Sequence, residues 1–254
     1  MDVRLAFLLS RAEEALPRLQ ALGLGAEVYL DPALLEEDAL FQSLRRRLPG
    51  RVSVHLPFWN LDLLSPDPDV RGLTLRRPLF GLDRAAELGA DRAVFHSGIP
   101  HGRTPEEALE RALPLAEALG LVVRRARTLG VRLLLENSHE PCPEVLRPVL
   151  EAHAGELGFC FDAAHARVFS RTPDPGPWLA LGPEHLHLND TDGVYDRHWN
   201  LGRGVLGHRE WLLPFLGRTL VLEVREDPEA SLAFLQALAG EGRTAFDRLL
   251  MEGR

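Results

Sequence analysis

Nine side chains of the types that bind divalent metal ions lie at, or just after, the ends of short apolar runs. They are five histidines, two aspartates and two glutamates: His55, His96, Glu136, Asp162, His165, His187, Asp196, His198 and Glu223. Imidazole and carboxylate groups suit zinc and manganese. If the apolar runs are strands of one barrel, these side chains meet at one mouth. The sequence therefore predicts an enzyme that holds more than one metal ion.

The segment 187–204 is the densest part of this pattern. It places His187 on a short apolar run, and Asp196 and His198 on the loop that leaves it. A single histidine on an apolar run is more often a hydrogen-bonded core residue than a metal ligand. A carboxylate at the end of an apolar strand, such as Glu136, is costly to bury without a cation, an arginine or a proton. Because such groups recur at six successive strand ends, the pattern favours a metal site over separate core roles.

Short β-rich runs alternate with amphipathic stretches eight times along the chain. The connections are short and rich in Gly, Pro and Asp, as in repeated βα units around a parallel sheet. The predicted strands are 3–9, 26–30, 51–56, 92–96, 132–136, 158–162, 185–189 and 219–224. The turn after the first strand lacks the glycines of a nucleotide-binding open sheet. The expected fold is α/β, a (β/α)8 TIM barrel that forms a single domain over 1–254.

Amphipathic stretches predict helices over 11–22, 32–48, 105–129, 143–153 and 229–238. Three of these starts carry a capping side chain followed by proline, at Asp31, Thr104 and Asp227. Pro114 and Gly120 are the points where the helix over 105–129 would break. The crossover 169–182 is rich in proline and is expected to be mostly loop.

Strand parity indicates where the polar side chains point, because alternate residues of a strand face opposite sides of the sheet. Glu136 shares a face with Leu134, whereas Leu133 and Leu135 share the other. The same reasoning applies to His96, Asp162, His187 and Glu223. The large apolar neighbours suit packing under helices. The polar residues are therefore expected to point inward at the C-terminal ends of the strands, where catalytic groups of such barrels lie.

Five residues near the expected mouth are candidates for substrate binding: Arg197, Arg203, His139, Phe58 and Trp59. The arginines, with Arg167 as a further candidate, would bind anions, although each could equally have a structural or solvated role. Phe58 and Trp59 directly follow His55 and would wall the pocket or pack in the core.

Four further histidines are not expected to be ligands. His101, His153 and His208 are predicted on the surface or in loops, and His185 is predicted below His187 in a supporting or packing role.

Composition narrows the function further. All 29 basic residues are arginine, which excludes Schiff-base chemistry and lysine-containing phosphate loops. The net charge of −8 argues against a broad basic face for nucleic acid.

There is no apolar run long enough for a membrane span and no leader pattern, so a cytoplasmic location without membrane contact is expected. Two cysteines, Cys142 and Cys160, are too few for a disulfide framework, and Cys160 is expected to pack in the barrel. The arginine-rich composition is typical of a thermophile. No protein partner is evident.

At the residues that carry this pattern, the chain resembles the endonuclease IV branch of the xylose isomerase-like TIM barrels. The matching segments are 54–61, Phe95-His96-Ser97-Gly98, Leu135-Glu136-Asn137, Cys160-Phe161-Asp162-Ala163-Ala164-His165, His187-Leu188-Asn189-Asp190, Asp196-Arg197-His198, Leu201-Gly202-Arg203-Gly204 and Leu222-Glu223. They run over about two-thirds of the chain, in the family's order.

The resemblance implies three metal ions, usually zinc and in some members manganese. One ion would be held by His55, His96 and Glu136. Glu136 would bridge to a second ion that also takes Asp162, His187 and Glu223, and a third would be held by His165, Asp196 and His198. The same resemblance implies that Glu223 orients or deprotonates an attacking water.

Three segments depart from the endonuclease IV pattern. The loop Tyr29-Leu30-Asp31-Pro32 is short and acidic and lacks the residues with which that family grips DNA. The loop after Glu136 lacks that family's glycine-containing turn, and Ser97 replaces its usual proline. These differences weaken the expectation of duplex DNA binding and leave the metal ligands unchanged.

The sequence therefore supports three hypotheses of function. The first is hydrolysis of a phosphoester by metal-activated water, on an abasic nucleic acid site or on a smaller sugar-phosphate-like molecule. The second is a metal-dependent isomerase or epimerase of sugars or sugar phosphates, with Glu136 and Glu223 moving protons. The third is a barrel that retains metal and binds a ligand without turnover.

Overall fold

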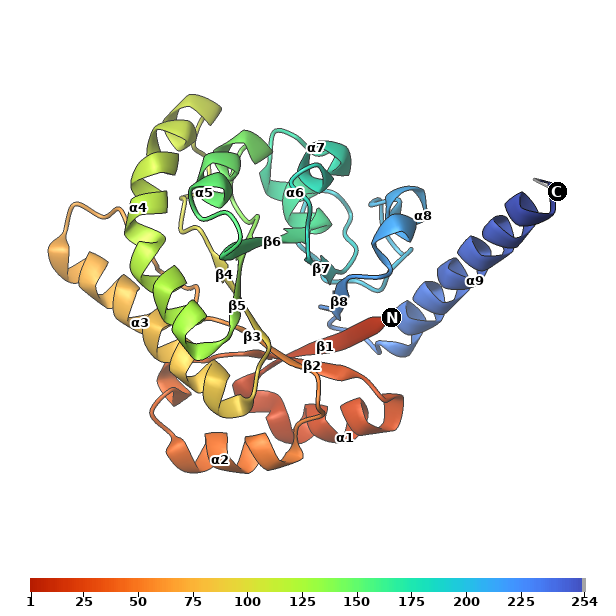
Figure 1. Cartoon of the computed structure of the whole chain (residues 1–254), viewed down its shortest axis with the longest axis horizontal. Coiled ribbons are helices and arrows are strands. Elements are labelled where there is room, and N and C mark those ends of the chain that lie inside the picture. Colours follow the sequence, from red (N-terminus) through yellow and green to blue (C-terminus); the bar gives the residue numbers. More distant parts are fainter. Residues whose placement is uncertain (253–254) are drawn as a thin grey trace.

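The computed structural model describes the backbone of residues 1–252 and the side chains of residues 1–243. Eight parallel strands form a closed barrel in which each strand pairs with its neighbours in sequence and β8 pairs with β1 (Figure 1). The strands are β1 Asp2–Leu8, β2 Gly25–Tyr29, β3 Val52–His55, β4 Arg92–His96, β5 Arg132–Glu136, β6 Leu157–Asp162, β7 His185–Leu188 and β8 Thr219–Leu222. The predicted TIM barrel is confirmed, with all eight strands within one or two residues of their expected bounds.

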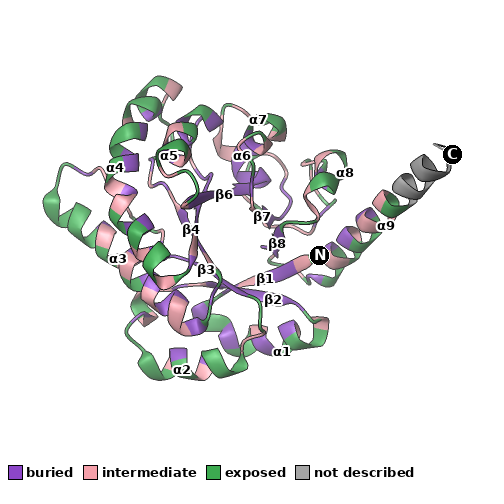
Figure 2. Cartoon of the chain, viewed as in Figure 1, coloured by how far each residue is buried: buried purple, intermediate pink, exposed green. Residues whose placement is uncertain are grey.

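The helices lie outside the strands, as the parity of the apolar residues requires. They are α1 Ala12–Leu22, α2 Asp38–Arg47, α3 Pro68–Leu88, α4 Pro105–Leu129, α5 Arg147–Ala152, α6 Ala163–Phe169, α7 Pro175–Leu179, α8 His208–Trp211 and α9 Glu229–Glu252. Short 3-10 turns occupy Leu9–Arg11, Pro32–Leu34, Pro143–Val145 and Leu213–Phe215. Figure 2 shows buried residues along the strands and on the inner sides of the helices, with exposed residues on the outer sides.

The barrel interior holds its own small apolar layer. Val94, Leu134 and Cys160 are fully buried and form a cluster separate from the main core. Leu133 and Leu135, which alternate with Leu134, belong instead to the core between the sheet and the helices. The parity prediction is confirmed, and so is the placement of Cys160 inside the barrel. Each of these three interior residues lies two positions before a predicted ligand on its own strand.

Several helices differ from the sequence prediction. The helix over 105–129 is continuous through Pro114 and Gly120, because a buried stripe that includes Ala112, Leu115 and Leu119 anchors its inner face. The stretch 32–48 divides into a 3-10 turn and α2. The sequence pattern did not single out α3, and the proline-rich crossover contains the short α7 as well as loop. The caps were predicted correctly: Asp31 and Thr104 accept backbone hydrogen bonds, and Thr104 forms a full capping box with Glu107.

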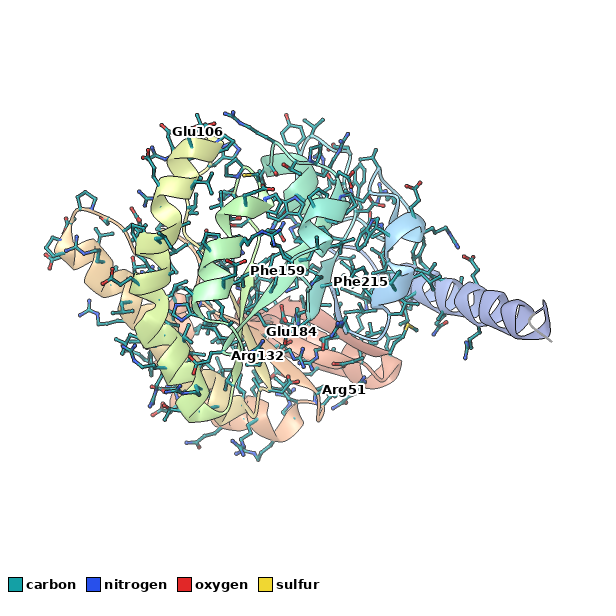
Figure 3. All side chains as sticks on the ribbon, turned by 45° about the horizontal axis from the view of Figure 1, so that its top comes forward. Arg51, Glu106, Arg132, Phe159, Glu184 and Phe215 are labelled. Carbon is teal, nitrogen blue, oxygen red and sulfur yellow. The ribbon has the colours of Figure 1, made fainter. Side chains whose placement is uncertain are left out.

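The N-terminal end of the barrel is closed by ion pairs. The guanidinium of Arg132 on β5 donates to Glu184, with Nε and Oε2 3.0 Å apart, and Figure 3 shows the two residues close together. Arg4 on β1 is buried and pairs with Asp2 and Asp91. These buried and half-buried charged groups therefore neutralise one another. No helix in the described part of the chain is long and apolar enough to cross a membrane.

Candidate metal centre

All nine residues predicted as ligands come together at the C-terminal end of the barrel, and we call them the ligand cluster. Its first part joins three neighbouring strands, β3, β4 and β5. Nε2 of His55 and Nε2 of His96 each lie 3.1 Å from Oε2 of Glu136. The strand register explains the meeting, because His96 and Glu136 are direct partners across β4 and β5. These three residues offer donor atoms close enough to hold one ion.

The second part of the cluster gathers around the other oxygen of Glu136. Nδ1 of His187 lies 3.0 Å from Oε1 of Glu136 and 2.7 Å from Oε1 of Glu223. Asp162 is the register partner of His187, and it offers an oxygen close to donor atoms of Glu136 and His165. Glu136 therefore turns Oε2 toward His55 and His96 and Oε1 toward His187, which is the geometry that a carboxylate between two ions requires.

The third part of the cluster comes from α6 and the loop after β7. Oδ2 of Asp196 lies 2.9 Å from Nε2 of His198 and 3.7 Å from Nε2 of His165. The other oxygen of Asp196, Oδ1, is buried without a hydrogen-bond partner among the described residues. His198 has a φ of 53°, one of two non-glycine residues with positive φ in the described chain. Such a conformation is costly and is found where the surrounding structure holds a functional side chain in place.

Asp190 shapes the loop that carries Asp196 and His198. Its carboxylate accepts hydrogen bonds from the backbone N–H groups of Thr191, Gly202 and Leu206, at 2.9, 3.0 and 3.2 Å. Its backbone pairs in both directions with Trp199. Gly204 packs so closely that a Cβ atom there would lie 2.0 Å from the carbonyl oxygen of Thr191. The motif around 187–204 therefore specifies a tightly closed loop as well as ligands.

Backbone carbonyls set the orientation of several imidazoles. Nδ1 of His55 donates to the carbonyl of Leu56 at 2.8 Å, and Nδ1 of His198 donates to the carbonyl of Glu223 at 2.8 Å. Nδ1 of His165 likewise lies 2.9 Å from the carbonyl of Asn137. Each contact directs the Nδ1 proton to a backbone carbonyl and turns Nε2 toward the cluster as the nitrogen that would bind a metal ion. The donor set and its orientation thus fit divalent metal ions.

Burial and neighbouring charges shift the pKa values of the cluster residues. Burial alone would raise the pKa of Glu136, but the charges of His187 and His96 hold that pKa well below its usual value. Burial lowers the pKa of His198, but Asp196 and Glu223 outweigh it and raise that pKa to about 9. Burial raises the pKa of Asp162 to about 6. A cation that binds here would replace protons on the imidazoles.

Glu27 is a buried carboxylate that the sequence analysis missed. It points into the barrel from β2, where Oε1 lies 2.8 Å from Nε2 of His187 and Oε2 lies 2.9 Å from Nε2 of His185. Ser53 donates to Oε2 at 2.6 Å. The predicted supporting role of His185 agrees with this contact. The strand parity that places Glu136 inside the barrel also predicts an inward Glu27, since Glu27 is the polar residue between Ala26 and Val28.

Tyr29, the last residue of β2, is a second residue of the site that was not predicted from the sequence. Its ring stacks on His55 with centroids 4.5 Å apart, and its hydroxyl donates to Oε1 of Glu223. Burial and the charge of Glu223 raise the pKa of Tyr29 well above its usual value, so the phenol stays protonated as a donor. β1 lies between β2 and β8 in the closed barrel, so the two side chains meet only across the end of β1, and no local sequence pattern predicts this pair.

Two asparagines hold Asp162. Asn137 accepts from the Asp162 N–H at 2.9 Å and donates to its carbonyl at 2.8 Å, while the Asn189 amide donates to Oδ2 at 3.0 Å. Both asparagines belong to the motifs that carry the family resemblance, directly after Glu136 and two residues after His187.

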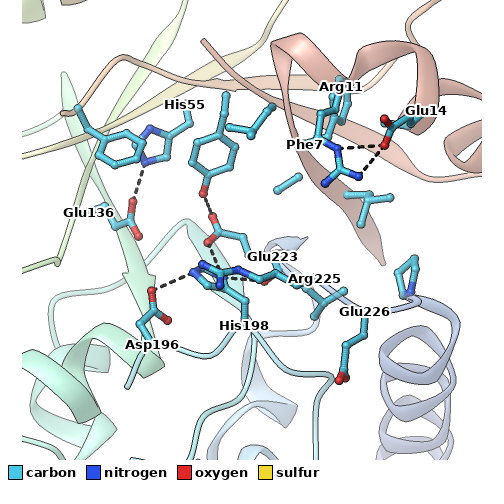
Figure 4. Close-up of a pocket in the computed structure, with 18 of the residues that line it drawn as sticks. Phe7, Arg11, Glu14, His55, Glu136, Asp196, His198, Glu223, Arg225 and Glu226 are labelled. Carbon is cyan, nitrogen blue, oxygen red and sulfur yellow. Dashed lines mark hydrogen bonds and ion pairs between the residues drawn. The ribbon is translucent and has the colours of Figure 1, made fainter. Parts of the chain in front are cut away.

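A cavity of about 710 Å³ opens over the cluster (Figure 4). Tyr29, His55, His96, Glu136, His165, Asp196, His198 and Glu223 line it. Phe58 and Trp59 also line it, which is the first of the two placements considered for them, and the ring centroid of Phe58 lies 4.9 Å from that of His55 and 4.7 Å from that of His96. A cavity of this volume suits a small molecule.

The arginines predicted to bind substrate have other partners. Arg197 pairs with Asp192 at 2.7 Å and stacks on Tyr195, and Arg203 pairs with Glu226 and stacks on Trp199. Neither is among the residues that line the cavity, whereas Arg11, Arg18 and Arg225 are.

The remaining histidines lie apart from the cluster. His139 packs against His101 and Phe169, with ring centroids 5.5 and 4.8 Å away, and does not line the cavity. Burial lowers the pKa of His139 to about 4. His208 was predicted on the surface or in a loop, and this is wrong: it lies in α8, is 2% exposed and packs on Trp211 and Phe234. His208 is the first residue of the short α8, and the local sequence, which reads as a loop, did not predict this helix.

Comparison with known proteins agrees with the geometry. The chain matches the family model described as xylose isomerase-like TIM barrel over residues 20–238. It is 28% identical to the uncharacterized protein MJ1311 of Methanocaldococcus jannaschii, over 72% of this chain and 65% of that protein. It is 29% identical to a probable endonuclease 4 of Solibacter usitatus, over 71% of this chain and 73% of that protein. The chain thus spans less than two-thirds of the length of MJ1311.

Solved structures show the same fold. The TTHB071 protein from Thermus thermophilus, from a soak with ZnCl2, is 93% identical with a TM-score of 0.94, over 95% of this chain and 99% of that chain. A D-tagatose 3-epimerase-like protein has a TM-score of 0.77 at 21% identity, over 98% of this chain and 100% of that chain. Endonuclease IV from the same organism, Thermus thermophilus, has a TM-score of 0.64 at 23% identity, over 95% of this chain and 100% of that chain. With its closed barrel, the family match and relatives that include probable endonuclease 4 proteins, the chain belongs to the xylose isomerase-like TIM-barrel family.

Proposed function

We propose that the protein is a metal-dependent phosphoesterase that acts on a sugar-like substrate. The observation that carries this proposal is the convergence of nine imidazole and carboxylate side chains beneath one cavity. The group of His165, Asp196 and His198 is the decisive part, because it adds a third set of ligands to those that a single-ion isomerase needs.

The cluster divides into three ligand sets. His55, His96 and Glu136 form the first, Glu136, Asp162, His187 and Glu223 the second, and His165, Asp196 and His198 the third. Zinc or manganese ions bound there would activate water, stabilise the negative charge of a phosphoester in the transition state and clamp its oxygens.

The residues of the chain then have distinct tasks. Glu223 takes a proton from water as the water oxygen attacks phosphorus. The bond between phosphorus and the sugar oxygen breaks, and that oxygen takes a proton from solvent to become a hydroxyl group. The charge of His187 keeps the pKa of Glu223 low despite burial, so the carboxylate is available as a base. Tyr29 holds Glu223 in place by its hydroxyl, and Phe58 and Trp59 cover the cavity wall.

The comparisons support this assignment at a coarser level. Several curated relatives are probable endonuclease 4 proteins, which makes phosphoester chemistry a reasonable expectation. The structure of TTHB071 comes from a soak with ZnCl2, so zinc is the first ion to test.

A sugar isomerase or epimerase is the second candidate. It is favoured by the fold likeness to epimerase structures, including the D-tagatose 3-epimerase-like protein. Glu136 and Glu223 would then remove and return a proton at a carbon next to a carbonyl. The two candidates share the fold and differ in metal count and product.

Metal content and a substrate panel separate the candidates. Two or three ions per chain by elemental analysis support the phosphoesterase, and one ion supports the isomerase. The panel contains an abasic duplex, a generic phosphodiester, and aldose and ketose sugars with their phosphates, with Glu223→Gln as the control for each activity. Hydrolysis that Glu223→Gln abolishes is the expected result. Isomerisation without hydrolysis would overturn the proposal, and no turnover at all would favour a binding protein that retains metal.

A further inference from the structure

Three arginines line the cavity, and they differ in whether their charge is neutralised. Arg11 donates to Glu14 through Nε and Nη2, at 3.0 and 2.6 Å. Arg18 pairs with Asp227 at 2.7 Å. Arg225 has no ion pair or side-chain hydrogen bond with any residue of the described chain.

Arg225 is held next to the ligand cluster by its backbone. Its N–H donates to the carbonyl of His198 at 3.0 Å, and it lies two residues after Glu223. Both Glu223 and Arg225 line the cavity, and Figure 4 shows Arg225 on the same side of it as His198 and Glu223. Arg225 is an exposed residue that lines the cavity, so its charge is accessible to a ligand there.

The nearest acidic residue in sequence does not neutralise Arg225. Glu226 directs its carboxylate to Arg203, and the backbone N–H of Asn200 donates to Glu226 at 3.3 Å. Because Glu226 pairs with Arg203, Arg225 has no acidic partner among the residues whose side chains are described. A guanidinium binds phosphate and carboxylate through two parallel N–H donors.

We infer that Arg225 forms an anion-binding subsite beside the ligand cluster, and that the substrate is a small sugar-like molecule with a phosphate or carboxylate group. The inference deepens the proposed function, on which it rests for the occupied cluster. The cavity of about 710 Å³ has room for such a molecule, within the range usual for small-ligand sites. Arg225, and neither Arg197 nor Arg203, would then supply the anion contact predicted from the sequence.

The test compares three probes on one carbon skeleton: D-ribose 5-phosphate, D-ribonate and D-ribose. Their binding to zinc-loaded protein is measured by calorimetry in the Glu223→Gln background, in which hydrolysis is expected to be abolished, and the arginine variants are made in that background. For Arg225→Gln we expect binding of at least one anionic probe to weaken by about tenfold or more, the value typical of a lost charged hydrogen bond. Binding of D-ribose should change less than about twofold, since D-ribose carries no charge for the guanidinium to bind. The larger of the two anionic losses identifies phosphate or carboxylate as the natural group.

Arg218→Gln is the matched control. Arg218 is also exposed and without a side-chain partner among the described residues, but it precedes β8 at the opposite end of the barrel from Arg225. The two variants change the net charge equally. Equal affinities of Arg225→Gln and Arg218→Gln for both anionic probes would overturn the subsite, as would an equal loss for D-ribose.

Two further outcomes separate this inference from the proposed function. The metal content of Arg225→Gln should equal that of the unmodified chain. Hydrolysis of a phosphoester by both proteins at equal KM would overturn the subsite alone. An abasic duplex that binds while all three small probes fail would overturn the small-molecule substrate but not phosphoester chemistry.

Discussion

Oε1 of Glu27 lies 2.8 Å from Nε2 of His187, a member of the ligand cluster, and both side chains are fully buried in the barrel. The opposite nitrogen of the same ring, Nδ1, faces Glu136 and Glu223. The Glu27 carboxylate therefore contacts Nε2, which points away from Glu136 and Glu223, and Nδ1 remains as the atom that would bind a metal ion. This carboxylate–histidine pair resembles the supports that commonly orient metal-binding imidazoles.

We predict that Glu27→Gln weakens metal binding by about 10- to 100-fold, as for other supports of metal-ligating histidines. The amide keeps the shape of the side chain but removes the charge that fixes the His187 ring. Competition with a chelator of known affinity measures the change. Glu184→Gln is the control, because it makes the same substitution at the other end of the barrel, where Glu184 pairs with Arg132. Metal affinity equal to that of the unmodified protein would show that Glu27 does not orient His187.

Tyr29→Phe is expected to reduce kcat about tenfold with the metal content unchanged, from the usual value of one lost hydrogen bond to a charged group. Without the hydroxyl, the Glu223 carboxylate loses a donor that favours its charged form, so its pKa rises. The acidic limb of the pH–rate profile should therefore shift to higher pH. Tyr195→Phe changes the only other tyrosine, which is 61% exposed and outside the cavity lining, and should leave the profile unmoved. A rate loss in Tyr29→Phe without a shifted limb would contradict the role assigned to Glu223.

Metal binding should release protons below about pH 9. His198 has a pKa raised from 6.5 to about 9 in the metal-free protein, mainly by Asp196 and Glu223 against the effect of burial. Because the folded pKa is the higher, the protonated ring stabilises the metal-free fold below pH 6.5, and this contribution is lost as the pH rises through about 9. Metal affinity should change in the opposite sense and rise with pH, by up to about tenfold per pH unit for each proton displaced.

Calorimetry in buffers of different ionisation enthalpy counts those protons. At about pH 8 the His198 ring, with its pKa of about 9, is still mostly protonated in the metal-free protein. Metal binding to His198→Gln at this pH should therefore release about one proton fewer than metal binding to the unmodified protein. His153→Gln should release the same number as the unmodified protein, because His153 contacts the carbonyl of Ala116 on α4 and lies outside the cavity lining. Metal binding that releases no protons between about pH 7 and the His198 pKa of about 9 would contradict the charge state assigned to His198.

Gly204→Ala should remove one metal ion per chain and leave the rest. The new Cβ would lie 2.0 Å from the Thr191 carbonyl oxygen, so the loop that carries Asp196 and His198 must shift. The ligands on β3, β4 and β5 belong to the barrel itself and should keep their ion. Gly217→Ala is the control, since a Cβ at Gly217 meets no atom of the described chain within 4 Å. Elemental analysis of both variants gives the count, and an unchanged stoichiometry in Gly204→Ala would show that the loop does not supply a metal site.

The sequence by itself determined the fold and the membership of the ligand cluster. The period-two alternation in runs such as 132–136 places Leu134 inside and Leu133 outside, and eight such runs with short connections favour a barrel. Glu136 at the end of its run therefore had to face the mouth. This reasoning works because the direction of a side chain in a strand depends on neighbours within a few residues.

Only the tertiary structure decided the partners of these groups. Glu27 meets His187, and Tyr29 meets Glu223, across 160 and 194 residues of sequence, because closure of the barrel brings inward side chains of strands that are not neighbours together. The tertiary structure also decided which arginines are paired: Arg203 is neutralised by Glu226, whereas Arg225 lines the cavity without a side-chain partner in the described part of the chain. The energy of a charge depends on which opposite charges lie within a few ångströms, and local periodicity carries no information about that distance.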